Sequence, residues 1–203
     1  MKDMMYIIKI EVLPMNDTLY LFVGKSASGK TTVADFLCKK HGYKQVWSYC
    51  TRPPRYEGEI GHIFVNDTEF DNLGELVAYT EYNGFRYGTT AEQLDKCNIY
   101  VVDVSGVKTL LERYKTNRQI MIFYFGANIC TRINRMVNRG DCDAAIISRL
   151  LQDEKEDWHD KLSDLIWSYR TSYNRRIYLF DMYADDDFAS VVTRAERYMG
   201  VSL

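Results

Sequence analysis

The sequence has no apolar run long enough to cross a membrane and no signal-peptide pattern at its start. Its five cysteines include no CxxC pair and no Cys/His spacing of the kind that holds zinc. Proline is rare, with three residues, and there is neither a low-complexity segment nor an internal repeat. We therefore expect a cytoplasmic protein with reduced thiols, and not a membrane, secreted, zinc-binding or repeat protein.

A strong charge of either sign is also missing, because the formal net charge is −2 although 27% of the residues are charged. Without an overall positive field, we expect no nucleic acid and no membrane surface among its partners. The 203 residues, 46% of them apolar, suit one globular domain with an inserted lobe. Any anion binding must come from local clusters.

Short apolar stretches alternate with helical patterns along most of the chain. This alternation predicts an α/β fold with three layers, in which a parallel sheet is covered by helices on both faces. Strands are expected at 18–23, 45–49, 99–103, 119–125 and 177–180. Helices are expected at 29–41, 107–114, 131–158 with a break near 139–141, and 187–199.

The segment from about 50 to 90 has a different character. After a loop at 51–61 it shows short strand patterns at 63–65, 76–82 and 85–87, and Asn83-Gly84 between the last two is a strong hairpin signal. We therefore predict a β-rich lobe at about 50–90, inserted into a core formed by 17–49 and 98–203, with residues 1–16 as an extension or edge strand.

The segment GKSASGKT at 24–31 satisfies the pattern GxxxxGK[ST]. A strand pattern precedes it and a helix pattern follows, which is the context that a phosphate-binding loop requires. Its backbone N–H groups and the helix N-terminus would bind the phosphates of ATP; the alternative is a glycine-rich turn with an incidental lysine. The predicted phosphate-binding residues are Gly24, Ser26, Ala27, Ser28, Gly29, Lys30, Thr31 and Thr32.

Three side chains near this loop have candidate chemical roles. Lys30 would bridge the β- and γ-phosphates, and the Thr31 hydroxyl would bind the Mg²⁺ that accompanies ATP. Asp103 ends a predicted strand, where it would act on Mg²⁺ through water or hold the acceptor. The alternative for Asp103 is a cap on the following helix.

Arginines form two clusters that fit phosphoryl transfer, because the planar guanidinium pairs well with phosphate oxygens. Arg52 and Arg55 lie in the lobe and would hold an acceptor phosphate. The second cluster would close over the donor from a helical lid at about 132–149; the alternative is a solvated arginine face paired with local acids. It consists of Arg132, Arg135, Arg139 and Arg149.

Four motifs together resemble the guanylate kinase family, in the right order from about Leu19 to about Glu156. They are VGKSASGKTTV, SYCTRPPRYEGEIGHIFV, YGTT and RINRMVNRGD with SRL after it. The resemblance implies a P-loop kinase fold with an acceptor-binding lobe and a helical lid. It also implies transfer of the γ-phosphoryl group of ATP to a nucleoside monophosphate, with Mg²⁺.

The same resemblance assigns roles by position. Lys30, Arg135, Arg139 and Arg149 would be the catalytic set around the transferring group. Ser48, Arg52, Arg55, Tyr87 and Thr89 would bind the acceptor, together with Asp103.

Two positions depart from the family pattern: His62 replaces a lobe tyrosine, and Ala78 stands where the family has a glutamate that reads guanine. The expected acceptor is therefore GMP, dGMP or another nucleoside or deoxynucleoside monophosphate. Two alternatives stay open: a P-loop kinase of another small phosphorylated acceptor, and a guanylate-kinase-like module that binds protein without catalysis. The intact loop disfavours the second.

Overall fold

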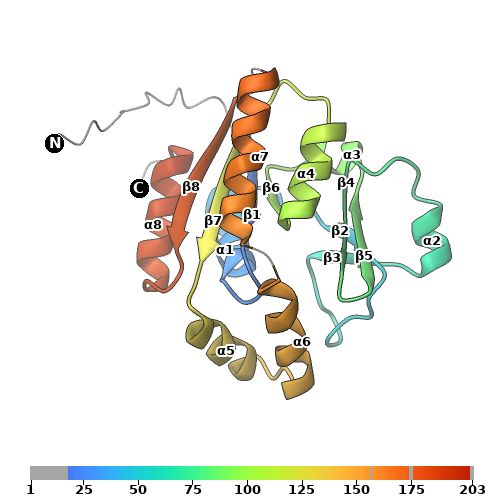
Figure 1. Ribbon diagram of the computed structural model, residues 1–203, viewed down its shortest axis with the longest axis vertical. Helices are drawn as coiled ribbons and strands as arrows, with labels where there is room; N and C mark the ends of the chain where they lie inside the picture. The colour runs from blue at the N-terminus through green and yellow to red at the C-terminus, as the bar shows by residue number, and fades with distance from the viewer. Residues whose placement is uncertain (1–17, 156, 174–175, 202–203) are drawn as a thin grey trace.

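The computed structural model describes residues 18–155, 157–173 and 176–201 (Figure 1). The predicted extension or edge strand at 1–16 lies outside these ranges. The central sheet has the strand order β6-β1-β7-β8, and all neighbours run parallel. Its strands are β1 (Thr18–Val23), β6 (Ile99–Val101), β7 (Gln119–Gly126) and β8 (Ile177–Tyr183).

Helices cover both faces of this sheet, as the sequence pattern predicts. The side chains of β1 alternate between the two faces, so Leu19 and Leu21 enter one hydrophobic cluster while Tyr20 and Phe22 enter the other. On the first face lie α4 (Val104–Arg113) and α7 (Trp158–Tyr173), and on the second α1 (Lys30–His41) and α8 (Phe188–Met199). The three-layer α/β prediction is confirmed.

The inserted lobe is a four-stranded sheet of order β3-β2-β5-β4. At the predicted hairpin, Asn83 and Gly84 have φ of 52° and 76°, the left-handed values that such a turn requires. Strand β4 packs against α4, which attaches the lobe to the core. The lobe strands are β2 (Ser48–Cys50), β3 (His62–Phe64), β4 (Ala78–Tyr82) and β5 (Phe85–Thr89).

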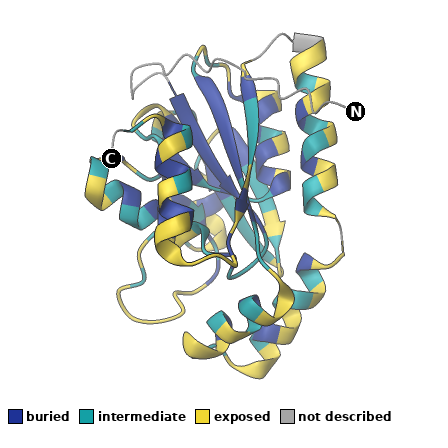
Figure 2. Ribbon diagram, turned by 90° about the vertical axis from the view of Figure 1, so that its left-hand side faces the viewer, coloured by how far each residue is buried: buried dark blue, intermediate teal, exposed yellow. Residues whose placement is uncertain are grey.

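The lid consists of α5 (Ile129–Asn138) and α6 (Asp143–Asp153), which lie below the carboxyl ends of the sheet strands (Figure 1). Gly140, with φ of 85°, allows the chain to reverse between them. Figure 2 shows the sheet buried while much of the lid surface is exposed. Within the described ranges, no helix combines the length and apolar character needed to cross a bilayer.

Several predicted boundaries were wrong. The helix expected at 131–158 has the predicted break near 139–141, but it also has a second break that was not predicted, because α6 ends at Asp153 and a separate helix, α7, begins at Trp158. The strand expected at 45–49 is replaced by β2, and Gln45 makes only an isolated bridge to Ile99. The short helices α2 (Asp67–Asp71) and α3 (Ala91–Asp95) were not predicted; both begin with capping boxes.

Candidate functional site

The predicted phosphate loop, at 24–31, connects β1 to α1 by a backbone path that few residues can follow. Gly24 and Gly29 have φ of 149° and 99°, and Ala27 also has a positive φ, of 58°. A Cβ on Gly24 would lie 2.4 Å from the carbonyl oxygen of Phe125, so the loop presses directly against β7. This contact places the loop at the carboxyl ends of the central strands, where α/β sheets bind ligands.

Lys30 lies folded over the loop and is surrounded by acceptors. Its Nζ donates to the carbonyl oxygens of Gly24 and Lys25, at 2.6 and 2.8 Å, and to Ser28 Oγ at 3.3 Å. Burial lowers the pKa of Lys30 to about 8, while the charges of Asp153 and Asp103 oppose this shift. The ammonium is thus held where the oxygens of a bound polyphosphate would replace its present partners.

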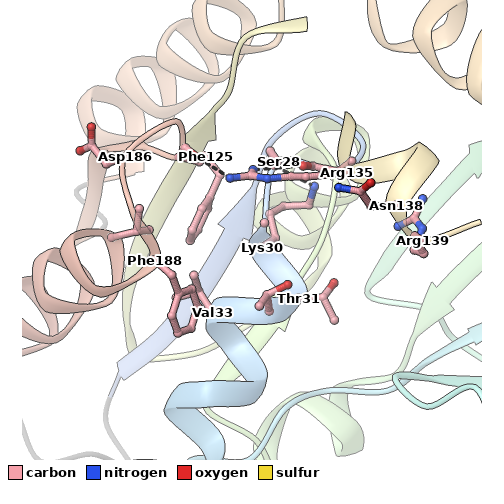
Figure 3. A pocket seen from close by; sticks show the side chains of 15 residues that line it. Ser28, Lys30, Thr31, Val33, Phe125, Arg135, Asn138, Arg139, Asp186 and Phe188 are labelled. Atoms are coloured by element: carbon pink, nitrogen blue, oxygen red, sulfur yellow. Dashed lines mark hydrogen bonds between the residues drawn. The ribbon is translucent and has the colours of Figure 1, made fainter. Parts of the chain in front are cut away.

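A cavity of about 630 Å³ opens on one side of the loop (Figure 3). Arg135 crosses it, donating to the carbonyl oxygen of Ala184 at 2.6 Å and to that of Ala27 at 3.3 Å. Part of the cavity wall comes from the C-terminal segment of the chain, just before and within α8. The sequence motifs end near Glu156, so they did not predict these residues. The cavity is lined by Ala27–Val33, Phe125, Arg135, Asn138, Arg139, Ala184, Asp186, Phe188 and Val191.

A second cavity, of about 160 Å³, lies between the loop and the lobe. Lys30 lines both cavities, whereas Thr31 and Thr32 line only the first. The structure therefore does not bring Thr31 and Asp103 into one cavity. The second cavity is lined by Gly24, Ser26, Lys30, Ser48, His62, Thr80, Tyr82, Tyr87, Tyr100, Val101, Val102, Asp103 and Trp158.

Asp103 lies in the second cavity and also caps α4. Its Oδ1 accepts from the Gly106 amide and its Oδ2 from the Thr80 hydroxyl, both at 2.7 Å. Burial raises the pKa of Asp103, and these two hydrogen bonds oppose the shift. In the part of the chain that the structure describes, no group of three or more His, Cys, Asp or Glu side chains could hold a metal ion.

Arg52 and Arg55 converge on one carboxylate, Glu59. Arg52 is buried and donates to both Glu59 oxygens, at 2.9 and 2.6 Å, while Arg55 donates through its amide at 2.7 Å and its guanidinium at 3.1 Å. Burial acts to raise the pKa of Glu59, but these hydrogen bonds lower it to about 2. A dianionic phosphate could take the place of this carboxylate between the two arginines. Glu59 was not among the site residues predicted from the sequence.

The other predicted acceptor residues have different surroundings. Ser48 Oγ is 3.0 Å from His62 Nδ1, and burial together with the charge of Arg52 lowers the pKa of His62 to about 4, so its ring is neutral. Tyr87 lies in the cavity wall, 5.6 Å from the His62 ring. Thr89 does not line this cavity: it is fully buried and donates to the Tyr100 hydroxyl at 2.9 Å.

Arg139 and Arg149 face each other across the lid, where both pair with Asp141. Burial opposes ionisation of Asp141, but the hydrogen bond from Arg139 and the charges of both arginines hold its pKa below the usual range. Burial lowers the pKa of Arg55, and the charges of Arg52, Arg149 and Arg139 contribute to the same shift. Each of the two predicted clusters thus pairs with a carboxylate of its own, Glu59 in the lobe and Asp141 in the lid.

The prediction that Arg132 belongs to the lid cluster is wrong. Its side chain is 2% exposed and donates to Asp153 at 2.6 Å and to Glu154 at 2.9 Å. Its Nε also donates to the carbonyl oxygen of Ser26 at 3.0 Å. Arg132 thus joins the phosphate loop to the end of α6 and lines neither of the two cavities described above.

No family model matches the chain. It is 34% identical over 122 residues to a curated guanylate kinase of Geobacter metallireducens; the match covers 51% of this chain and 57% of that protein, and so less than two thirds of the relative's length. The crystal structure of guanylate kinase from Anaplasma phagocytophilum has a TM-score of 0.53 and 16% identity, with 93% of this chain and 87% of that one covered. The predicted resemblance to guanylate kinases is confirmed by the sequence match, and the structural match supports the same fold.

Proposed function

We propose, with the resemblance to guanylate kinases as the premise, that this chain is a nucleoside monophosphate kinase. It would transfer the γ-phosphoryl group of ATP to GMP, dGMP or another nucleoside or deoxynucleoside monophosphate in the cytoplasm. The observation that carries the proposal is the position of Lys30, whose side chain lines two cavities at once. ATP would occupy the larger cavity and the acceptor the smaller one.

Each group of residues has a role in this reaction. The loop amides and Lys30 would hold the β- and γ-phosphates, and Arg135 would fix the loop against the donor cavity. Arg52, Arg55, Ser48 and Tyr87 would grip the acceptor phosphate. The charge that spreads over the transferring oxygens would meet Arg139 and Arg149 from the lid.

Magnesium would arrive with the nucleotide. Mg²⁺ keeps several waters and commonly uses substrate phosphates with only one or two protein groups, so the absence of a carboxylate cluster in the described chain fits this ion. Thr31, exposed in the donor cavity, would be its ligand. The ion would neutralise charge on the β- and γ-phosphates, while Asp103 would act only through water.

Substitutions in the two arginine clusters should change different kinetic parameters. Arg52→Ala or Arg55→Ala should mainly raise the acceptor KM, because these residues would grip a phosphate that keeps its charge throughout the reaction. Arg139→Ala or Arg149→Ala should mainly lower kcat, because they would meet charge that develops in the transition state. Steady-state kinetics with the acceptor varied at saturating ATP distinguishes the two effects. Equal changes in the same parameter for all four variants would contradict this division.

The nucleobase preference should be weaker than that of a guanine-reading site. On β4, Ala78 shares its face with Thr80 and Tyr82 and is fully buried, while Glu81 lies on the opposite face and accepts from Tyr79 at 2.5 Å. No carboxylate of β4 therefore takes the place of the missing glutamate. A site that pairs the donors of a substrate rejects analogues lacking them by roughly 10⁴-fold or more.

We therefore expect kcat/KM for GMP to exceed that for the next-best nucleoside monophosphate by much less than about 10⁴-fold. The measurement is kcat/KM for GMP, dGMP, AMP, CMP, UMP and dTMP, with ADP release coupled to a detectable reaction. Turnover of several bases is the expected result. A strong preference for GMP or dGMP over every other base would show that another residue reads guanine, and no turnover of any of them would count against the proposed function itself.

A further inference from the structure

The hydroxyl group of Tyr82 lies where three parts of the molecule meet. Tyr82 is the last residue of β4 in the lobe, and its oxygen is 3.0 Å from Ser26 Oγ in the phosphate loop. The same hydroxyl donates to Asp153 Oδ1, at the end of α6, at 2.9 Å. One side chain of the acceptor lobe therefore contacts both the donor loop and the base of the lid.

The partners of Tyr82 are themselves fixed. Asp153 is fully buried, and its Oδ2 accepts from the Ser26 amide at 2.8 Å and from Arg132 at 2.6 Å. Burial raises the pKa of Tyr82, so its hydroxyl stays protonated and able to donate. The phosphate loop, the lid base and the lobe are thus joined by direct hydrogen bonds that centre on the fully buried Asp153, while Ser26 and Tyr82 are half-buried. Hydrogen bonds are stronger where water is partly excluded.

The backbone pairing of the lobe strands links Tyr82 to the residues proposed to bind the acceptor. Tyr82 pairs with Phe85 across the hairpin, and Thr80 pairs with Tyr87, one of the proposed acceptor-phosphate ligands. Strand β5 continues the sheet to β2, where Cys50 pairs with Tyr87 and Ser48 begins the strand. The hydrogen bond of Tyr82 to the phosphate loop therefore fixes the distance from that loop to the proposed acceptor ligands Tyr87 and Ser48.

We propose that Tyr82 is a positioning residue, whose hydroxyl fastens the acceptor lobe to the phosphate loop and so sets the distance between the two substrates. The inference rests on the proposed kinase function. In-line transfer depends steeply on geometry, and a misplacement of about 1 Å can cost roughly 100-fold in rate. A lobe freed at this point would still carry Arg52, Arg55 and Tyr87 and would still bind the acceptor.

The test is Tyr82→Phe, which keeps the ring in the cavity wall and removes only the hydroxyl. We expect kcat to fall about 10- to 100-fold, because the acceptor would no longer be aligned with the donor phosphate. The acceptor KM should change little, because the residues proposed to bind the acceptor phosphate remain. The matched control is Tyr79→Phe, which removes a hydroxyl from the opposite face of the same strand, where it bonds only to Glu81 among the described contacts. The control should keep both kinetic parameters.

Amide hydrogen exchange of the ligand-free protein gives a second readout that does not depend on catalysis. In Tyr82→Phe we expect faster exchange in residues 24–29 and 85–89, with the control variant unchanged. An unchanged kcat, or unchanged exchange in both segments, would overturn the inference. A raised acceptor KM with unchanged kcat would also overturn it, because Tyr82 would then be a direct ligand. A wild-type chain without kinase activity would instead refute the proposed function, and the exchange experiment would still decide the role of Tyr82.

Discussion

Lys30→Ala should abolish phosphoryl transfer while the fold survives. Among the described residues, the hydrogen bonds of the Lys30 ammonium go to the loop itself, to two carbonyl oxygens and Ser28 Oγ, so its loss breaks none of the described hydrogen bonds between elements. A preorganised cation or donor at the transferring group contributes about 3 to 4 kcal/mol, so we expect kcat to fall by at least about 100-fold. The measurement is the steady-state rate of ADP release at saturating ATP and acceptor.

A matched control is available on the same helix. Lys39 lies in α1 and its side chain is exposed, so Lys39→Ala removes one positive charge without touching either cavity. We expect normal turnover in this control, and a circular dichroism spectrum like that of the wild type in both variants. Near-normal turnover in Lys30→Ala would contradict the role of the phosphate loop.

The largest expected effect on stability comes from Arg132→Met. Arg132 and Asp153 form an ion pair in which the two side chains are 2% and 0% exposed. Removing one partner of a buried pair leaves an uncompensated charge, which typically costs about 3–5 kcal/mol. We therefore expect a loss of that size in the free energy of unfolding, measured by urea denaturation.

Two further variants define the cause of this loss. The double variant Arg132→Met/Asp153→Leu should be more stable than Arg132→Met, since no buried charge is left alone. Lys96→Ala, which breaks an exposed pair with Glu92, should leave the denaturation midpoint almost unchanged. A small effect of Arg132→Met, comparable to that of Lys96→Ala, would show that the pair is not a structural connection between the loop and α6.

The local parts of the fold and site could be predicted from the sequence. The loop at 24–31 follows from glycine spacing between a strand and a helix, and the hairpin follows from Asn83-Gly84, because both depend on residues adjacent in the chain. The three layers follow from the alternation of strand and helix patterns. These features need no information about distant partners.

The remaining features depend on which distant residues meet. Arg132 lies three residues before Arg135 on one helix face, yet it is buried against Asp153 while Arg135 lines the cavity of about 630 Å³. Helical periodicity gives the face of each arginine but not what covers it. The contact between Tyr82 and Ser26 joins residues 56 positions apart, so no local pattern could indicate it.

Two more predicted acceptor contacts differ from the structure because the predicted residues bond to other side chains of the protein. Thr89 was predicted as an acceptor ligand from the family resemblance, and it shares the face of Tyr87 on β5. It is nevertheless fully buried at the end of that strand, where its hydroxyl bonds to the Tyr100 hydroxyl instead. Glu59 occupies the two arginines that the motif assigns to phosphate, and only the folded loop reveals this carboxylate between them. Both cases concern contacts that spacing alone does not determine.

We expect ATP and the acceptor to react with each other in one site. The most direct measurement incubates the protein with ATP, Mg²⁺ and one nucleoside monophosphate at a time, and quantifies all nucleotides by chromatography. We expect one nucleoside diphosphate for each ADP formed, and neither product when the monophosphate is omitted or Lys30 is replaced by alanine. ADP formed without a matching diphosphate, or no product with any monophosphate, would contradict the account.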